Sequence, residues 1–417
     1  MKTLIRKFIP DFLLSWYHFF LAFLGALLYR FPSMKIKVIG VTGTNGKTTV
    51  VNFTTKILET AGFKVASLSS IKFKIGDKES KNTLKMTMPG RFKLQKFLRQ
   101  AVSSKCQYAL LEVTSEGIVQ HRHKFINFEA AVFTNLTPEH IEAHRGFDNY
   151  RRAKRKLFQA ANKIHVINMD DENARYFLQF PAKKKYLYQF KNQNEKCKIT
   201  IENSKISKDI DDFTINLKLL GKFNIYNSLA AICVGLSQRV NLEVAKRAVE
   251  TIEGVPGRME EVISVPFKVF VDYAFTPNAL EQVYKTLKPS QGKMIAVLGS
   301  CGGGRDKWKR PVLGKIAAKY CDRIIITNED PYDEDPLEII DQVASGIKNY
   351  ESGIMKILDR RGAIRESLRL ARPGDTVIIT GKGCEPWIIE ARGKKIPWDD
   401  REVVKEEFRK LSATNDF

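Results

Sequence analysis

A glycine-rich segment close to the N-terminus constrains this chain more than any other feature. The apolar run KIKVIGVTG (35–43) has the character of a buried strand, and GTNGKTT (43–49) opens a predicted helix that extends to about Thr60. A strand, a glycine turn and a helix start in this order present backbone amides to a phosphate group. We therefore expect a P-loop in which Lys47 neutralises the β- and γ-phosphates of ATP and Thr48 binds Mg²⁺. The predicted phosphate-binding residues are Gly43, Thr44, Asn45, Gly46, Lys47, Thr48 and Thr49.

The rest of the chain alternates predicted strands and helices, which indicates largely parallel sheets covered on both faces. The alternation of predicted strands and helices is interrupted near VPG (255–257) and then resumes. We therefore expect an α/β chain with two such domains. Residues 35–256 are expected to form a central P-loop ATP-binding domain with a mostly parallel sheet, and residues 257–417 a C-terminal Rossmann-like domain. The stretch 184–220 is rich in Lys, Asn, Ile and Thr and is expected to form hairpins at a sheet edge.

Two polar residues follow predicted buried strands. Glu112 ends the run YALLE (108–112), and His140 comes shortly after AAVFTN (130–135). Ligands gather at the carboxyl ends of parallel strands, so both residues are candidates for binding Mg²⁺. Taken alone, each residue is also compatible with a structural role.

The segment before the first predicted strand (1–34) is apolar. Its run FIPDFLLSWYHFFLAFLGALLYRF (8–31) holds 18 consecutive residues without Asp, Glu, Lys or Arg, from Phe12 to Tyr29, at the short limit for a membrane-spanning helix. The aromatic residues favour a helix lying in a membrane interface; the alternative is a helix packed against the protein or a partner. The net charge of +23 suits an anionic membrane surface or a polyanion, or reflects a general solubility bias.

Composition excludes several classes of protein. No motif interleaves aromatic and basic residues as nucleic-acid-binding modules do, so we expect no nucleic-acid partner. The six cysteines are widely spaced and form no C-x-x-C pair. Reduced thiols are therefore expected rather than a disulfide framework or a zinc site. Reduced thiols predict a cytoplasmic protein, and membrane contact through the apolar segment 8–31 would place it at the inner face of the cell membrane.

A series of motifs resembles the Mur ligases over about residues 36–400. In chain order they are TGTNGKTT, LEVTSEGIVQHR, FTNLTPEHIEAH, YRRAKRKLF, GKFNIYNSLAAI, VPGRME, VDYAFTPNAL, GSCGGGRDKWKRP, TNEDPYDEDP and GKGCEP. The chain is most similar to the UDP-N-acetylmuramoyl-dipeptide:amino-acid ligases. The resemblance implies an enzyme that uses ATP and two Mg²⁺ ions to activate a peptide carboxylate as an acyl phosphate. It then joins that peptide to an amino acid in cell-wall peptide synthesis.

The resemblance also implies roles for individual residues. Lys154 of YRRAK matches a lysine that is carbamylated in this family, which would turn a cation into an anionic Mg²⁺ ligand. The implied catalytic residues are Lys47, Glu112, His140 and Lys154, and the implied metal ligands are Thr48, Glu112, His140 and carbamylated Lys154. Further nucleotide contacts are implied for Asn227, Arg258 and Asp272. The implied acceptor contacts are Thr87, Thr114, Gln120 and Arg122, and the amino-acid contacts are Arg310, Asp330, Tyr332, Gly381 and Glu385.

The sequence departs from the family pattern in places that concern the substrates. Family members carry a UDP-binding domain before the P-loop, whereas about 35 apolar residues stand there in this chain. We therefore expect an acceptor that is either nucleotide-linked or lipid-linked. Tyr332 replaces the Arg with which diaminopimelate-adding enzymes bind the distal carboxylate, so lysine or another amino acid is favoured. The acids Asp330, Asp333, Glu334 and Asp335 suit a cationic side chain, or else cap helices and face solvent.

Further replacements are Phe275, Cys384 and Glu116, each at a position where the family usually has His. They concern substrate contacts more than the ATP machinery. Two alternatives to a cell-wall ligase remain at this point. One is another acid–amino-acid ligase of the superfamily, of folylpolyglutamate or cyanophycin type, and the other is a non-catalytic ATP-binding subunit of a membrane complex.

Overall fold

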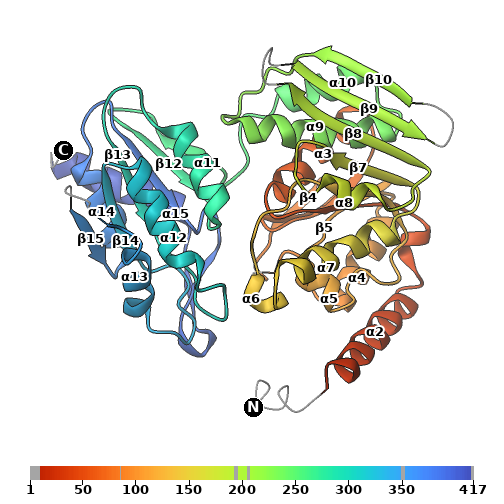
Figure 1. The fold of residues 1–417 in the computed structure, drawn as a ribbon, viewed down its shortest axis with the longest axis horizontal. Helices are drawn as coiled ribbons and strands as arrows, with labels where there is room; N and C mark the ends of the chain where they lie inside the picture. Colours follow the sequence, from red (N-terminus) through yellow and green to blue (C-terminus); the bar gives the residue numbers. More distant parts are fainter. Residues whose placement is uncertain (1–9, 85, 192–195, 204–206, 349–352, 415–417) are drawn as a thin grey trace. The chain divides into compact units, whose positions relative to one another are not determined.

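The computed structural model describes residues 10–414 except 85, 192–195, 204–206 and 349–352. The chain divides into two compact units (Figure 1). The first unit takes the chain up to Pro138 together with Phe147–Glu253, and the second takes Glu139–Gly146 together with Gly254–Phe417. The boundaries that the sequence suggests at residues 34 and 256 remain predictions.

The first unit is built on a ten-stranded sheet with the order β10-β9-β8-β7-β6-β1-β5-β2-β3-β4. Its strands are β1 (Lys37–Thr42), β2 (Val65–Leu68), β3 (Lys72–Ile75), β4 (Lys78–Lys81), β5 (Tyr108–Glu112), β6 (Phe128–Phe133), β7 (Ile164–Asn168), β8 (Lys184–Lys191), β9 (Lys196–Asn203) and β10 (Ser207–Phe213). The central strands pair in parallel, and antiparallel pairs stand at both edges. One edge is the hairpin region predicted for residues 184–220.

The central strands are buried on both faces, and the helices of this unit pack against the sheet or against one another. They are α2 (Asp11–Leu28), α3 (Lys47–Thr60), α4 (Arg91–Ser103), α5 (Ser115–Val119), α7 (Phe147–Ala160), α8 (Ala174–Leu178), α9 (Lys222–Ser237) and α10 (Leu242–Glu250), with the 3-10 turn η1 (Pro32–Met34). Leu98 of α4 and Leu157 of α7 share one buried apolar cluster with Leu111 of β5. Helices α3, α9 and α10 pack against one another.

The second unit contains a six-stranded sheet with the order β11-β12-β16-β13-β14-β15, parallel except for β11. Its strands are β11 (Glu260–Ile263), β12 (Lys268–Asp272), β13 (Met294–Leu298), β14 (Arg323–Thr327), β15 (Ile354–Ile357), β16 (Thr376–Thr380) and the small pair β17 (Trp387–Ile389) and β18 (Lys395–Pro397). Its helices are α6 (Ile141–His144), α11 (Pro277–Leu287), α12 (Lys309–Tyr320), α13 (Pro336–Ala344), α14 (Arg360–Leu370) and α15 (Asp400–Thr414), with η2 (Ala391–Gly393).

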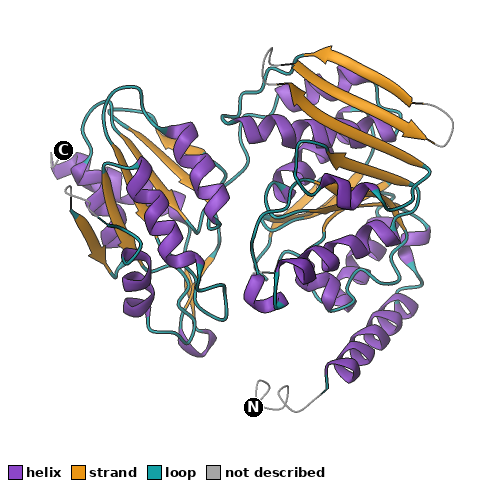
Figure 2. Cartoon of the chain, viewed as in Figure 1, coloured by secondary structure: helices purple, strands orange, loops and turns teal. Residues whose placement is uncertain are grey.

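Two separate apolar clusters lie in this second unit. One joins Leu280 of α11 and Leu313 of α12 to strand residues, and the other joins Ile364 of α14 and Val404 of α15 to strand residues. A mostly parallel sheet with helices on both faces is the architecture that the strand–helix alternation predicts. The expected α/β fold class is therefore confirmed for both units, as Figure 2 shows.

Helix α2 belongs to the first unit and packs against α4. Ala22 and Ala26 are buried, and a Cβ built on Gly25 would lie 3.7 Å from the backbone of Arg91. Small residues therefore line the contact side and let the two helices approach closely. Across the described residues, no helix is long and apolar enough to cross a membrane.

Candidate active site

A tight glycine loop joins β1 to α3. Gly43 has a φ of +151° and Gly46 a φ of +82°, in the region that favours glycine. A Cβ at Gly43 would lie 1.9 Å from Thr134 Oγ1, and one at Gly46 would lie 2.2 Å from Asn227 Oδ1. Both positions therefore require glycine, and the predicted nucleotide contact Asn227 lies against the loop.

Two lysine side chains converge on one carbonyl group of the loop. Lys47 Nζ donates to Gly43 O at 3.0 Å and to Thr44 O at 2.7 Å. Lys154 Nζ, from α7, donates to the same Gly43 oxygen at 2.7 Å. The loop amides, the start of α3 and the Lys47 ammonium form a cationic cradle of the kind that binds a polyphosphate.

Lys154 is unusual because it is almost fully buried, with 2% of its surface exposed. Burial, followed by the nearby charge of Lys47, lowers the pKa of Lys154 well below its ordinary value. A lysine with a lowered pKa holds part of its population as a neutral amine, which is nucleophilic. Lys154 can therefore react as an amine rather than serve only as a fixed cation.

Glu112 ends β5, the strand that neighbours β1, and pairs with Val41 in the sheet register. It is completely buried, and its carboxylate accepts hydrogen bonds from Ser70 N at 2.9 Å and from Ser70 Oγ at 3.2 Å. The same hydroxyl lies 2.8 Å from Thr87 Oγ1. The predicted metal ligand Glu112 and the predicted acceptor contact Thr87 are thus joined through one serine.

The other predicted acceptor contacts lie around α5. Thr114 caps this helix by accepting from Gly117 N. Arg122 donates to Gln120 Oε1 at 2.7 Å and to the carbonyl of Met88, the residue after Thr87. A Cβ on Gly117 would lie 2.5 Å from Met88 Sδ, so the two segments touch. The structure therefore brings Thr87 close to the three predicted contacts that lie within the single motif LEVTSEGIVQHR.

His140 lies in the second unit, on the short segment Glu139–Gly146. Asp306 accepts from the backbone amides of Ile141 and Glu142, each at 3.0 Å, and so caps the start of α6. Lys309 Nζ lies 2.9 Å from Glu139 Oε1, and both side chains are buried. These contacts fix the segment on the second unit, and the shared metal role of His140 and Glu112 stays a prediction.

The residues of the first unit suit ATP and Mg²⁺. The cradle at Gly43 and Gly46 is too tight for any side chain and leaves backbone amides for phosphate oxygens. Thr48 and Glu112 offer oxygen atoms, which Mg²⁺ prefers. Lys154 as an ammonium would repel a cation, whereas its carbamate would offer an oxygen. Within the described residues no group of three or more His, Cys, Asp and Glu side chains is arranged to hold a metal.

Asp272 organises the loop at the end of β12. Its carboxylate accepts from Met259 N and from Ala274 N, each at 2.6 Å. Burial raises the pKa of Asp272, and the charge of Arg258 opposes that rise. The Arg258 guanidinium also lies 4.3 Å from the centre of the Tyr273 ring. The two residues predicted to contact the nucleotide from this unit are therefore held by neighbouring segments.

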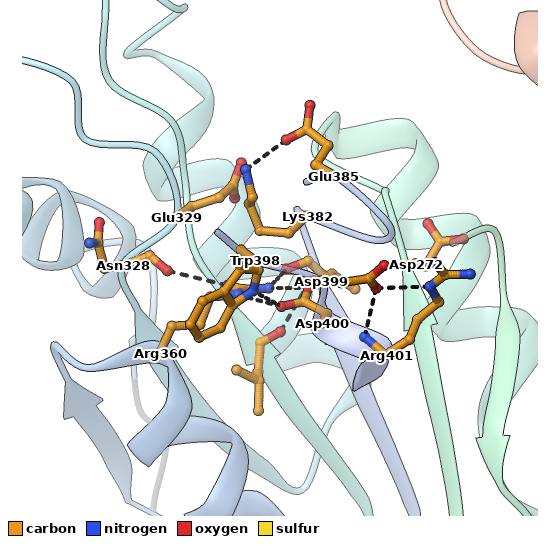
Figure 3. A network of polar contacts seen from close by, with 12 residues as sticks. Asp272, Asn328, Glu329, Arg360, Lys382, Glu385, Trp398, Asp399, Asp400 and Arg401 are labelled. Atoms are coloured by element: carbon orange, nitrogen blue, oxygen red, sulfur yellow. Dashed lines mark hydrogen bonds and ion pairs between the residues drawn. The ribbon is translucent and has the colours of Figure 1, made fainter. Parts of the chain in front are cut away.

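A buried cation, Lys382, contacts two of the predicted amino-acid contacts. Its Nζ lies 3.0 Å from both oxygens of Asp330. It also lies 2.7 Å from Glu385 Oε2, a contact drawn in Figure 3. Tyr273 donates to the other oxygen of Glu385 at 3.1 Å. Burial opposes the charge of Lys382, but Glu385 and Asp330 outweigh it and raise the pKa of this lysine. Asp330 and Glu385, both predicted to contact the amino acid, therefore already bind the Lys382 ammonium.

The remaining acids of EDPYDEDP (329–336) are also engaged. Asp333 accepts from Arg392 N, Glu334 pairs with the predicted contact Arg310 at 2.9 Å, and Asp335 caps α13. The alternative that these acids serve structure is therefore favoured over a direct role in binding a cationic side chain.

Glu329 is a functional candidate that the sequence did not single out. It is buried, its Oε1 accepts from Cys301 Sγ at 2.8 Å, and its Oε2 has no hydrogen-bond partner in the described part of the chain. A Cβ on the predicted contact Gly381 would lie 2.3 Å from Oε2. Burial raises the pKa of Glu329. In the sequence, the one signal that could have indicated Glu329 is its position directly before Asp330.

A second polar network, around Arg360 and Asp400, lies beside Lys382 (Figure 3). Arg360 pairs with Asp400 at 2.7 Å, and both side chains are buried. Arg360 also donates to Thr380 O at 2.9 Å and to Asn328 O at 3.3 Å, and Trp398 Nε1 donates to Asp400 Oδ1 at 2.8 Å (Figure 3). These bonds link the ends of β14 and β16 to α15.

Replacing Trp398 by Phe is expected to lower the free energy of unfolding by about 1.5–3 kcal/mol, because it removes a donor to a buried carboxylate. Denaturant unfolding of the second unit measures the change. Trp387→Phe is the matched control, since Trp387 Nε1 is buried without a hydrogen-bond partner among the described residues. An equal loss in both variants would assign the effect to ring packing rather than to the hydrogen bond.

A phosphate-binding loop at the carboxyl edge of a parallel sheet, followed by a Rossmann-like unit, defines a P-loop enzyme that uses ATP. The chain matches the Mur ligase middle domain over residues 41–235 and the Mur ligase glutamate ligase domain over residues 257–383. It belongs to the Mur ligase family and is an ATP-dependent ligase, as the sequence motifs predicted.

Relatives agree with this membership. The chain is 38% identical to a UDP-N-acetylmuramoyl-L-alanyl-D-glutamate–2,6-diaminopimelate ligase of Syntrophomonas wolfei, over 93% of this chain and 81% of that protein. A solved structure with the same enzyme name shares 29% identity and a TM-score of 0.56, over 90% of this chain and 79% of that one. The folylpolyglutamate synthase of Mycobacterium tuberculosis with ADP has a TM-score of 0.65 at 16% identity, over 86% and 90% of the chains, which is a likeness of fold alone.

Proposed function

We propose that this Mur ligase joins the carboxylate of a muramoyl-peptide acceptor to the amino group of an amino acid in cell-wall peptide synthesis. The observation that carries the proposal is the glycine cradle in which Lys47 and Lys154 meet on the Gly43 carbonyl. It lies within the part of the chain that matches the Mur ligase middle domain. The relatives named above are ligases of this kind by name.

Charge explains why the reaction needs such a cradle. A carboxylate that attacks the γ-phosphorus of ATP is an anion approaching an anion. Lys47 and the loop amides reduce that repulsion and stabilise the transferring phosphoryl group. Mg²⁺ held by Thr48 and Glu112 would neutralise further phosphate charge. The carboxylate oxygen bonds to the γ-phosphorus while the bond from that phosphorus to the β-phosphate oxygen breaks, which gives an acyl phosphate and ADP. The amine then attacks the acyl carbon, a C–N bond forms, the C–O bond breaks, and inorganic phosphate and one proton leave.

Lys154 is proposed to act as a carbamate. The neutral amine adds to the carbon of CO₂, an N–C bond forms and one proton is released. The product is an anion at the position where Lys154 Nζ now donates to Gly43 O. Support comes from the burial of the side chain and from its lowered pKa.

The acceptor is proposed to bind along Thr87, Thr114, Gln120 and Arg122. Thr87 is joined to Glu112 through Ser70, and Arg122 contacts Met88, the residue after Thr87, so an acceptor carboxylate at Thr87 would be close to the metal ligand. The acceptor's carrier is UDP or a lipid, and each is compatible with these contacts to the peptide.

A screen of phosphate release tests the ligase reaction. The standard amino acids and diaminopimelate are offered with UDP-linked and with lipid-linked muramoyl dipeptide. We expect ATP turnover that requires both an acceptor and an amino acid. Absence of any amino-acid-dependent ATP use, with every acceptor and amino acid offered, would contradict the proposed reaction.

For the amino acid, we propose a substrate without a distal carboxylate, such as lysine. Tyr332 stands where the diaminopimelate-adding enzymes have Arg, and burial raises the pKa of its phenol to about 12. The side chain is therefore neutral and offers no ion pair to a carboxylate. Its ring lies against Gly303, where a Cβ would be 2.6 Å from the ring.

Tyr332→Arg is expected to raise kcat/KM for diaminopimelate by roughly 10- to 100-fold, the value of one charged hydrogen bond. Steady-state phosphate release measures it, with Tyr332→Phe as the uncharged control. If the unmodified enzyme already prefers diaminopimelate over lysine, the proposed specificity is wrong.

We also propose that the enzyme works at the inner face of the cell membrane, with residues 8–31 in contact with its surface. The aromatic residues of α2 and the positive net charge support this placement.

A further inference from the structure

Helix α2 carries the main apolar surface of the first unit. Trp16 is 69% exposed and Phe20 is 60% exposed, values far above those of a packed core residue. The exposed large apolar residues of α2 are Phe12, Leu13, Trp16, Tyr17, Phe19, Phe20, Phe23, Leu24, Leu27 and Leu28. A contiguous apolar surface of this kind marks an interaction site on a soluble protein.

The helix is fixed in place rather than loosely attached. Ser15 Oγ lies 2.8 Å from His121 Nε2. The Phe19 ring meets the rings of His121 and Phe125 edge-on, at 6.0 and 5.1 Å between centres. The Phe23 ring also meets Phe125, at 5.4 Å. These contacts, together with the Ala22 and Ala26 side against α4, hold the aromatic surface in a defined orientation.

A basic cavity of about 280 Å³ lies beside these contacts. Its lining residues are His121, His123, Lys124, Lys156, Gln159 and Ala160. His121 both lines the cavity and contacts Ser15 and Phe19 of α2, so the cavity lies next to the attachment side of this helix. His123 is 2% exposed, and its Nδ1 has no hydrogen-bond partner in the described chain.

The cavity lacks the carboxylates that would balance its charge. Among the described residues, neither Lys124 nor Lys156 has an acidic group within ion-pair distance. Burial, then the charges of Lys124 and Arg155, lowers the pKa of Lys156. Uncompensated cations around such a cavity favour an anionic occupant.

We propose that α2 and this cavity together form a docking surface for an anionic phospholipid bilayer. The Trp, Tyr and Phe side chains of α2 enter the interfacial layer, as aromatic residues do at membrane surfaces. The cavity receives a lipid phosphate, which Lys124, Lys156 and His123 contact. The inference rests on the proposed membrane placement and adds its lipid chemistry, and it does not depend on the ligase reaction.

A partner helix from another protein could cover the apolar side chains. It would leave the two lysines unbalanced unless it also carried acids at the right place. A bilayer surface with anionic headgroups supplies both an apolar layer and negative charge. Charge complementarity therefore favours the bilayer as the occupant.

Co-sedimentation of the full chain with vesicles tests the inference. Phosphatidylcholine vesicles are compared with vesicles in which about a third of the lipid is phosphatidylglycerol. We expect at least tenfold tighter binding to the anionic vesicles, weakening as salt is raised. The double variant Lys124→Gln, Lys156→Gln should lose roughly 10- to 30-fold in affinity, and Trp16→Ser with Phe20→Ser should lose binding to both vesicles.

A matched control removes the same charge elsewhere on the first unit. Lys183 and Lys184 are exposed, and their change to Gln should leave vesicle affinity within about twofold. Equal binding to neutral and anionic vesicles would keep the membrane placement and overturn the role of the cavity. Self-association that Trp16→Ser abolishes, without vesicle binding, would overturn both by showing a second copy as the occupant. Lipid-free phosphate release in the same preparation separates these outcomes from failure of the ligase proposal.

Discussion

Replacing Lys47 by Met is expected to lower amino-acid-dependent ATP turnover by about 10²- to 10³-fold, the typical effect of removing one preorganised group that stabilises transition-state charge. The Lys47 ammonium is held at the mouth of the cradle by Gly43 O and Thr44 O. Methionine keeps the length of the side chain but carries no charge. Repulsion between ATP and the attacking carboxylate is then opposed by the loop amides and metal ions alone.

Phosphate release under saturating ATP measures this effect, and nucleotide binding by calorimetry separates binding from turnover. Lys56→Met is the matched control, because Lys56 lies on the same helix α3 and is exposed. It should leave turnover within about twofold. Retention of most activity in Lys47→Met would remove the phosphate role of this lysine and, with it, the mechanism proposed above.

The phosphate loop was the part of the fold most open to prediction from sequence. Helix α3 spans Lys47–Thr60, the predicted residues. The reason is local: an apolar strand, glycines at positions with positive φ and a helix start specify one another within a few residues. Glu112 could also be placed from sequence, since a parallel strand beside β1 must end at the same edge as the loop.

Contacts between distant segments could not be predicted. Lys382 neutralises Asp330 from 52 positions further along the chain. The sequence near Tyr332 shows a cluster of acids with no neighbouring cation, whereas in the structure these acids bind residues from distant segments. Asp306 caps α6 across 165 positions and thereby assigns the segment of His140 to the second unit. Each of these pairings depends on tertiary packing, and no local pattern encodes it.

The apolar N-terminal segment is an intermediate case. Its composition predicted a helix, and α2 covers Asp11–Leu28. Which side of that helix faces the protein could not be read from a run that is apolar on nearly every position. The structure shows that Ala22, Gly25 and Ala26 face α4, which leaves the large aromatic side chains outside.

A dependence on CO₂ is the second large effect that we expect, and it concerns Lys154. Removing dissolved CO₂ and bicarbonate should reduce turnover by about 10²-fold or more, since the buried amine then offers no oxygen to Mg²⁺ and its charged form repels the ion. Adding bicarbonate should restore activity. Isotope-labelled CO₂ should give a carbamate carbon signal that is absent in Lys154→Ala.

The pH dependence of this carbamate follows from the lowered pKa of Lys154. Only the neutral amine adds CO₂, so activity should fall as pH drops through that lowered value. Without CO₂, the folded chain binds fewer protons at this lysine than the unfolded chain does. Stability should therefore rise with pH between the lowered pKa and the ordinary lysine value.

A matched substitution on the same helix distinguishes the carbamate from a general loss of positive charge. Arg152 is exposed on α7, and Arg152→Ala should keep both activity and its bicarbonate dependence. Lys154→Ala should lose both, and a small carboxylate such as acetate should restore part of the activity by occupying the space left beside Gly43 O. No carbamate can form on Lys154 in CO₂-free buffer. Full activity of the unmodified enzyme under that condition would therefore show that Lys154 works as an amine or a cation.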